Sequence, residues 1–269
     1  MIRIGTSGYS FKDWKGEFYP VDIKSNEMLE FYARHFKVVE INSTYYAIPK
    51  PATFERMAEN TPPDFGFMVK AYSGMTHERT DNKSVFDQFE EAIQPLVEAQ
   101  KFKGVLAQFP WSFKNVEENR KYLKMFRDRL AKYPLIVEFR HISWTSEPMF
   151  SFLRELGISY CAVDEPNLPG LVPPNVEATS NLGYVRFHGR NAKTWWGGDS
   201  AQRYNYLYTE QELQEWSPKI KQLAASTDET YVFFNNCHAG FAAKNAKTME
   251  GILQPDMFES PEQENDEKG

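Results

Sequence analysis

The chain has 269 residues, of which 41% are hydrophobic and 15% aromatic, and its formal net charge at pH 7 is −6. This length suits one α/β barrel, and the apolar share is large enough for a sizeable core. No apolar run approaches the roughly 20 residues that a bilayer-spanning helix needs, so we expect no membrane partner. A globally acidic protein is a poor general binder of nucleic acid, although a local basic cleft would change that.

The ends of the chain and its cysteines bear on compartment and domain structure. The opening sequence MIRIGTSGYS has no long apolar stretch before a small-residue cleavage site, so we expect no signal peptide. Cys161 and Cys237 lie far apart without metal or redox spacing, which favours a cytoplasmic protein with reduced thiols. The last eleven residues carry five acids and one lysine. We therefore expect one barrel domain over residues 1–255 and a flexible acidic tail over 256–269.

Short apolar runs recur along the chain, and a helical pattern or an extended loop follows each of them. A strand followed by a helix, repeated eight times, predicts a single-domain TIM-type (β/α)8 barrel of the α/β class. In such barrels the chemistry lies at the C-terminal ends of the strands. The eight runs are Ile2–Gly5, Val38–Ile41, Phe67–Lys70, Val105–Gln108, Leu135–Phe139, Tyr160–Val163, Tyr184–Phe187 and Tyr231–Phe234.

The connections between these runs are helical in most places. Two of them have an irregular pattern. After the sixth run, the proline-rich segment EPNLPGLVPPN predicts an extended loop in place of a helix. After the seventh run, Gly189–Tyr208 is long and aromatic, which is typical of a lid or a binding loop. Apolar spacing and capping residues predict helices at Met28–His35, Thr53–Glu59, Ser84–Ala99, Val116–Leu130, Glu147–Leu156, Thr209–Leu223 and Asn245–Leu253.

Charged residues gather at the predicted strand ends. Side chains two positions apart on a strand share a face. Burying charge is costly unless it is paired, so such a gathering needs a reason. The functional interpretation, which we favour, is a polar ligand; the structural alternative is a closed ion-pair network in which these carboxylates hold the arginines or Lys70. The pairs that share a face are Glu40 with Asn42, Glu138 with Arg140, and Arg186 with His188.

The segment EFRHISW brings an acid, a guanidinium, an imidazole and an indole to the end of the fifth run, as Glu138, Arg140, His141 and Trp144. Glu138 could act as a general base or as electrostatic support for Arg140. The planar guanidinium of Arg140 suits a carboxylate or phosphate. His141 fits proton transfer and helix capping equally well.

The segment RFHGR, Arg186–Arg190, follows the seventh run, where barrels often hold phosphate. Asn235 and Asn236 after the eighth run add amide donors on the same side. Together they predict a small anionic ligand that bears phosphate, carboxylate or sulfate. The alternative is that Arg186 pairs with Asp164 and that the glycine of this segment only turns the chain.

Metal binding is a further alternative. No HExxH or similar local spacing is present, and cations close to the same strand ends favour a site without metal. Aromatic residues in these loops fit stacking on sugars or bases, although packing over the barrel mouth is their commoner use. By residue type, the candidate metal ligands are Glu40, His77, Glu138, Asp164, His188 and His238.

Seven stretches of the chain, in order, resemble the YecE-like family, catalogued as domain of unknown function 72. The resemblance runs from about Ile2 to Leu253, with Tyr9 where the family more often has tryptophan. It implies a TIM-type barrel in a cytoplasmic protein of bacteria or archaea, and it implies no established reaction. The stretches are IGTSGYSFKDWKGEFYP, FKVVEINSTYYAIP, FMVKAYSGMTH, LAQFPWSF, VEFRHISW, YVRFHGR and YVFFNNCHAG.

The leading hypothesis is a hydrolase or lyase that acts on a phosphorylated or sugar-containing anion at the C-terminal mouth of the barrel, with no cofactor and no metal. The alternatives are a non-catalytic protein that holds a nucleotide or a nucleic-acid end, and a metal-dependent phosphodiesterase or endonuclease-like barrel. The catalytic candidates are Glu40, Glu138 and His188. The substrate-binding candidates are Asn42, Lys70, Gln108, Arg140, His141, Trp144, Asp164, Arg186, Arg190, Asn235 and Asn236.

Overall fold

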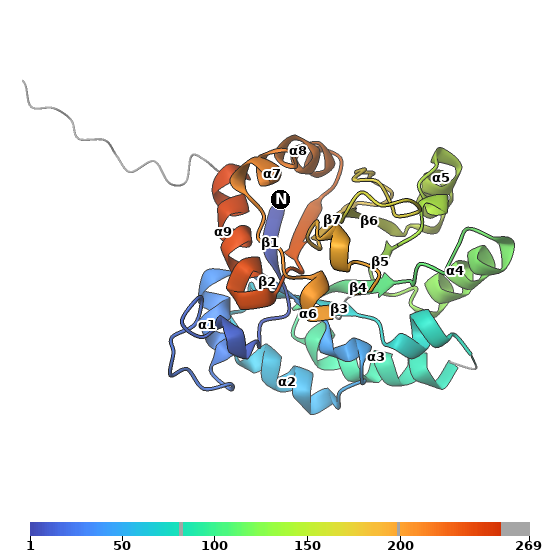
Figure 1. Ribbon diagram of the computed structural model, residues 1–269. Coiled ribbons are helices and arrows are strands. Elements are labelled where there is room, and N and C mark those ends of the chain that lie inside the picture. The colour runs from blue at the N-terminus through green and yellow to red at the C-terminus, as the bar shows by residue number, and fades with distance from the viewer. Residues whose placement is uncertain (81–82, 198–199, 254–269) are drawn as a thin grey trace, which may run out of the picture.

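Eight parallel strands form a closed barrel in the computed structural model, which describes residues 1–80, 83–197 and 200–253 (Figure 1). Each strand pairs with the next in chain order, and β8 pairs with β1 to close the ring. This confirms the predicted TIM-type barrel, with strand ends that differ from the prediction by a few residues. The strands are β1 (Ile2–Ser7), β2 (Val38–Ile41), β3 (Gly66–Lys70), β4 (Phe102–Gln108), β5 (Leu135–Glu138), β6 (Ser159–Asp164), β7 (Leu182–Phe187) and β8 (Glu229–Phe234).

Helices surround the barrel, as Figure 1 shows. The expected helix over Thr209–Leu223 is two helices, because Pro218 has no backbone N–H to continue the first one and instead opens the second. The described helices are α1 (Met28–His35), α2 (Pro51–Glu59), α3 (Lys83–Glu98), α4 (Glu117–Arg129), α5 (Glu147–Leu156), α6 (Ser200–Arg203), α7 (Glu210–Gln214), α8 (Ser217–Ala225) and α9 (Phe241–Leu253).

Both connections predicted to be irregular are irregular. All residues from Glu165 to Asn181 are described, and they contain neither helix nor strand. In the segment after β7, the described residues form a 3-10 turn at Ala192–Thr194 and the one-turn helix α6 before α7 begins. The expected flexible tail, residues 256–269, lies outside the described residues.

The interior and exterior of the barrel alternate along each strand. On β7, Phe187 packs outward against Tyr208 and Trp216, while Tyr184 and Arg186 point into the barrel. Gly5 on β1 allows the close approach of β2, because a Cβ atom there would lie 2.3 Å from the backbone oxygen of Val38.

The described part of the chain contains no helix that is both long enough and apolar enough to span a membrane.

Candidate functional site

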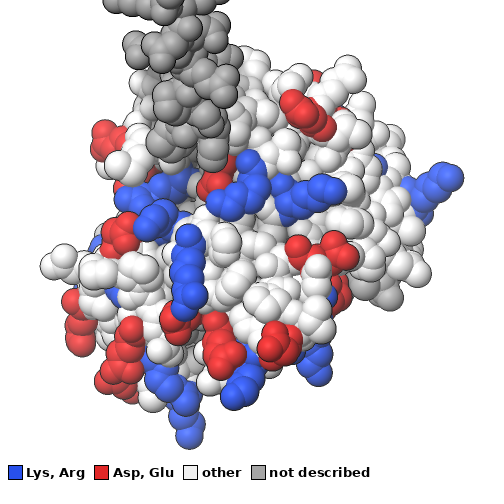
Figure 2. Space-filling view, turned by 90° about the vertical axis from the view of Figure 1, so that its left-hand side faces the viewer, with Lys and Arg blue, Asp and Glu red and all other residues white. Residues whose placement is uncertain are grey.

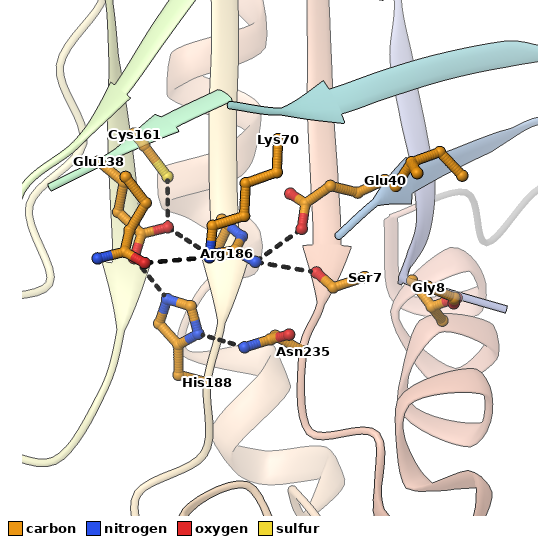
Figure 3. Close-up of polar contacts among 12 residues, drawn as sticks. Ser7, Gly8, Glu40, Lys70, Glu138, Cys161, Arg186, His188 and Asn235 are labelled. Carbon is orange, nitrogen blue, oxygen red and sulfur yellow. Dashed lines mark hydrogen bonds and ion pairs between the residues drawn. The ribbon is translucent and has the colours of Figure 1, made fainter. Parts of the chain in front are cut away.

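Arg186 lies at the centre of a polar network inside the barrel (Figure 3). Its side chain is 1% exposed, and its Nη2 atom donates to Glu40 Oε1 at 2.6 Å while its Nη1 atom donates to Glu138 Oε2 at 2.5 Å. Nη2 also lies 3.3 Å from the hydroxyl of Ser7. The second oxygen of Glu40 accepts from the hydroxyl of Tyr184 at 2.6 Å. One guanidinium on β7 thus bridges two carboxylates, one from β2 and one from β5.

Glu138 links this pair to a second arginine. Its Oε1 atom lies 2.5 Å from Arg140 Nη2 and 3.2 Å from His188 Nε2. Burial favours the protonated form of Glu138, but the charges of Arg140 and Arg186 outweigh it and hold the pKa of this carboxyl well below its usual range. Glu138 is therefore a carboxylate at neutral pH.

His188 is fully buried, with Nδ1 3.1 Å from the side-chain nitrogen of Asn235. Burial, and then the positive charge of Arg140, lower the pKa of His188 to about 3. The imidazole is therefore uncharged at neutral pH, so His188 does not act as a general acid in its imidazolium form. It fills the space between Arg140, Glu138 and Asn235.

Glu165 completes the network on the other side of Arg140. Its Oε2 atom accepts from Arg140 Nη1 at 2.9 Å, and its Oε1 atom accepts from the backbone N–H of Val172 at 3.3 Å. Burial raises the pKa of Glu165 to about 7, although Arg140 acts in the opposite direction. Since the residue lies in the irregular connection after β6, this loop is tied directly to the barrel interior.

A cavity of about 380 Å³ opens above this network at the C-terminal ends of the strands. Four of its lining residues are Lys or Arg, and no lining residue is Asp or Glu. A buried concentration of positive charge without acidic neighbours on the same wall favours anions. The lining residues are Asn42, Tyr45, Tyr46, Lys70, His77, Gln108, Pro110, Trp111, Arg140, Leu171, Arg186, Trp195, Trp196, Arg203, Tyr204 and Asn235.

Trp195 lies between two of these cations. Its ring centre is 5.8 Å from Cζ of Arg140 and 5.6 Å from Cζ of Arg203. The indole is 3% exposed, so it fixes the loop after β7 against the barrel mouth. Among the described residues Arg203 has no carboxylate partner, which leaves its guanidinium free to bind a ligand.

A second cavity, of about 520 Å³, adjoins the cationic one. The two share Asn42, Tyr46, Tyr204 and Asn235 in their linings, so they are neighbouring lobes of one depression in the mouth. Aromatic and small side chains from the loop after β1 form much of the second lobe. A ligand with a charged end and a less polar remainder would fit this pairing.

The structure brings nine of the fourteen predicted site residues together. Six line the cationic cavity: Asn42, Lys70, Gln108, Arg140, Arg186 and Asn235. Three lie beneath it and hold its cations: Glu40, Glu138 and His188. The structural alternative for the charges, a closed ion-pair network, is therefore present as the floor of the cavity.

Asp164 and Arg190 do not join this group. Asp164 accepts hydrogen bonds from the Tyr208 hydroxyl and the Trp216 indole, both at 2.6 Å, and from Arg190. This cluster lies outside the barrel, between β6 and the segment that contains α7 and α8. The alternative pairing of Arg186 with Asp164 was wrong, because Arg186 pairs with Glu40 and Glu138.

Three further candidates also lie outside the cavity lining. Trp144 is fully buried and stacks on Phe139, with ring centres 4.3 Å apart. Asn236 is buried and donates to the backbone oxygen of Tyr206. His141 accepts from the backbone N–H of Ser143, so it caps the short turn that follows β5, not α5.

Two residues of the site, Arg203 and Glu165, were not among the candidates predicted from the sequence. Arg203 lies in the long loop after β7, which had been recognised as a binding loop without any single residue being chosen. Glu165 directly follows Asp164, and strand alternation sends these two acids to opposite faces. No group of three His, Cys, Asp or Glu side chains able to hold a metal ion occurs among residues 1–80, 83–197 and 200–253.

These features define a TIM-type (β/α)8 barrel protein with a polar, cationic depression at the C-terminal ends of its strands. The sequence profile described as "Protein of unknown function DUF72" matches residues 3–267, so the chain belongs to the DUF72 family, as its motifs predicted. It is 36% identical to UPF0759 protein YunF of Bacillus subtilis (strain 168) over 270 residues, covering 94% of this chain and 95% of YunF. UPF0759 protein YecE of Escherichia coli (strain K12) is 41% identical over 78 residues, or 29% of this chain and 26% of YecE.

Solved structures of the family share the fold. A DUF72 family protein from Thermotoga maritima MSB8 superposes with a TM-score of 0.88 and 44% identity, over 94% of this chain and 99% of that one. A second, from Enterococcus faecalis V583, has a TM-score of 0.85 and 32% identity, over 94% and 96% of the two chains.

Proposed function

We propose that this protein is an enzyme, a hydrolase or lyase, that acts on a small phosphate- or carboxylate-bearing substrate bound at the barrel mouth. The observation that carries this proposal is the wall of the 380 Å³ cavity, which presents Lys70, Arg140, Arg186 and Arg203 and no acidic side chain. A cavity of this size is at the lower end of the range for small-molecule sites.

The four cations have different tasks. Arg140 and Arg186 pair with carboxylates below the cavity, which compensate much of their charge and occupy their donors. Arg203 and Lys70 lack carboxylate partners among the described residues and are the groups best able to contact the anion directly. The forked guanidinium of Arg203 matches two oxygens of a phosphate or carboxylate.

The acids beneath the cavity act as positioning residues in this proposal. Both Glu40 and Glu138 hold Arg186, and neither lines the cavity. Proton transfer to a substrate is then the task of groups on the wall itself, among which Lys70, His77 and Tyr204 have exchangeable protons.

The proposal is tested by calorimetric titration with inorganic phosphate and with glycerol 3-phosphate. Arg203→Gln should weaken binding at least tenfold, because it removes a guanidinium that lines the cavity and that pairs with no carboxylate among the described residues. The matched control is Arg34→Gln on α1, where an exposed arginine pairs with Glu30; it should leave the affinity unchanged. No binding to wild type, or equal losses in both variants, would overturn the proposal.

The second candidate is a protein that holds a nucleotide or a nucleic-acid end without turnover. Three exposed rings near the mouth favour it, since Tyr46 is 78%, Trp196 56% and Trp111 38% exposed. The face on the side of α1 and α9 is a different surface, and Figure 2 shows that basic and acidic side chains are interspersed on it. Salt-dependent binding of short oligonucleotides that Arg203→Gln abolishes, with no product formed from any phosphate ester, would favour this candidate.

A further inference from the structure

We propose that Lys70 forms an imine with a carbonyl group of the bound substrate, which makes the protein a lyase for a phosphate- or carboxylate-bearing aldehyde or ketone. This inference rests on the proposed function, because the anion site is what would bring the carbonyl to the amine.

Lys70 is the last residue of β3, and the strand fixes the start of its side chain. Its backbone oxygen accepts from the hydroxyl of Thr44 at 2.5 Å, which ties the strand end to the loop after β2. Its Nζ atom donates to Gln108 Oε1 at 3.1 Å and lies 4.5 Å from the centre of the Tyr45 ring. Figure 3 shows the side chain extended toward the guanidinium of Arg186.

The amine of Lys70 is held loosely compared with a structural lysine of the same chain. Within the described residues no carboxylate lies within 4.0 Å of its Nζ atom, and a single side chain accepts from it. Lys101 is buried, and its Nζ atom donates to the backbone oxygens of Ala58 and Thr61 and to the Thr61 hydroxyl. Lys70 therefore has donor positions left for a substrate, whereas Lys101 has none.

The surroundings of Lys70 also favour the uncharged amine, which is the form that attacks a carbonyl. Burial, and then the positive charge of Arg186, lower the pKa of Lys70 to about 7, although Glu138 and Glu40 act in the opposite direction. The neutral amine is therefore more accessible at neutral pH than it is for an ordinary lysine. A lysine beside another cation in a desolvated pocket is a recognised way to activate an amine nucleophile.

The step balances without an oxidant or reductant. The lone pair of Nζ attacks the carbonyl carbon, a C–N bond forms, and a proton that the nitrogen loses is taken up by the carbonyl oxygen. The same oxygen takes a second proton and leaves as water when the lone pair regained by the nitrogen forms the C=N bond. Overall, one amine, one carbonyl and one proton give one protonated imine and one water. The imine draws electrons from the bond next to it, which is the property that a lyase of this kind uses.

Arg203 and Lys70 line the same cavity of about 380 Å³, so one small molecule can place its anionic group at Arg203 and its carbonyl carbon at Lys70. The adjoining lobe of about 520 Å³ can hold the part of the substrate beyond the carbonyl.

The test is reductive trapping on the intact protein. Wild type is incubated with pyruvate or with dihydroxyacetone phosphate, treated with sodium borohydride, and mapped by mass spectrometry of its peptides. We expect a borohydride-dependent adduct on Lys70 in preference to every other lysine, and we expect excess inorganic phosphate to reduce it at least fivefold. Lys70→Arg should remove the adduct, while the matched control Lys101→Arg should retain it if its melting temperature shows that it folds.

The outcomes separate this inference from the proposed function. If phosphate binding depends on Arg203 but neither probe labels Lys70 preferentially, the anion site stands and the imine is wrong. If phosphate does not bind at all, the proposed function itself fails. Since the adduct is located in wild-type protein, the result does not depend on whether a Lys70 variant folds.

Discussion

The Nη2 atom of Arg186 donates to Oε1 of Glu40 at 2.6 Å, although 146 residues separate the two in the chain. Both side chains are almost completely buried, at 1% and 0% exposure. Because a buried ion pair is costly to break and modest in net value, this contact fixes the positions of β2 and β7 more than it adds stability.

Arg186→Met should lower the free energy of unfolding by about 3–5 kcal/mol, because it leaves Glu40 and Glu138 buried without their shared cation. Urea unfolding followed by circular dichroism measures it. The triple variant Arg186→Met, Glu40→Gln, Glu138→Gln removes the stranded charges as well, and it should recover a large part of the loss. A loss below about 1 kcal/mol for the single variant would contradict the network as described.

Asp164→Asn should lower the free energy of unfolding by roughly 2 kcal/mol, because the charged acceptor of Tyr208, Trp216 and Arg190 is lost. Its phosphate affinity should equal that of wild type, since Asp164 does not line the cavity. Comparison with Arg203→Gln in the same titration checks this separation. A marked loss of phosphate affinity in Asp164→Asn would mean that Asp164 contributes to ligand binding.

The reactivity of Lys70 should depend on pH with a midpoint near 7. Its acetylation by trace acetic anhydride should increase about tenfold per pH unit below the midpoint and level off above it, because only the neutral amine reacts. A lysine in an unstructured peptide in the same mixture should continue to gain reactivity up to about pH 10. If Lys70 and the peptide lysine showed the same dependence of acetylation on pH, the Lys70 amine would not be activated. The charged and titratable groups that act on Lys70 are Arg186, Glu138, Glu40, Arg140 and His77.

His188 should make the protein less stable in mild acid. Its folded pKa of about 3 lies below the ordinary value of 6.5, so its contribution is complete above pH 6.5 and declines as the pH falls. At pH 5 the loss should be about 2 kcal/mol, from roughly 1.4 kcal/mol per pH unit. His188→Gln should lose less between pH 6.5 and 5 in urea titrations. Equal slopes for the two proteins would mean that His188 is not held neutral.

The strands were predictable because their apolar runs are short, regularly spaced and ended by polar residues. The same regularity predicted that Glu138 and Arg140 share a face, and they form an ion pair. Alternation could not decide between Asp164 and Glu165, since either acid could have been the one facing inward. Asp164 was the acid predicted from the sequence, and Glu165 is the acid that contacts Arg140.

Local sequence could not predict which of the cations would line the cavity. Arg190 and Arg203 lie in the same loop after β7, but Arg190 pairs with Asp164, whereas Arg203 lines the cavity. The difference depends on how the loop folds over the mouth around Trp195, which is a long-range property. The division of Thr209–Leu223 into α7 and α8 was in contrast a local effect of Pro218 that the sequence could have revealed.

The pairing of β1 with β8 has a consequence for biosynthesis. Ile2 lies opposite Thr230, so β1, the first of the eight strands to be translated, has no partner on one edge until β8 has been translated. During that interval β1 presents unpaired backbone groups to other nascent chains. The ring can form only after translation of β8, so barrel closure is a late event and the incomplete sheet is the stage most exposed to aggregation.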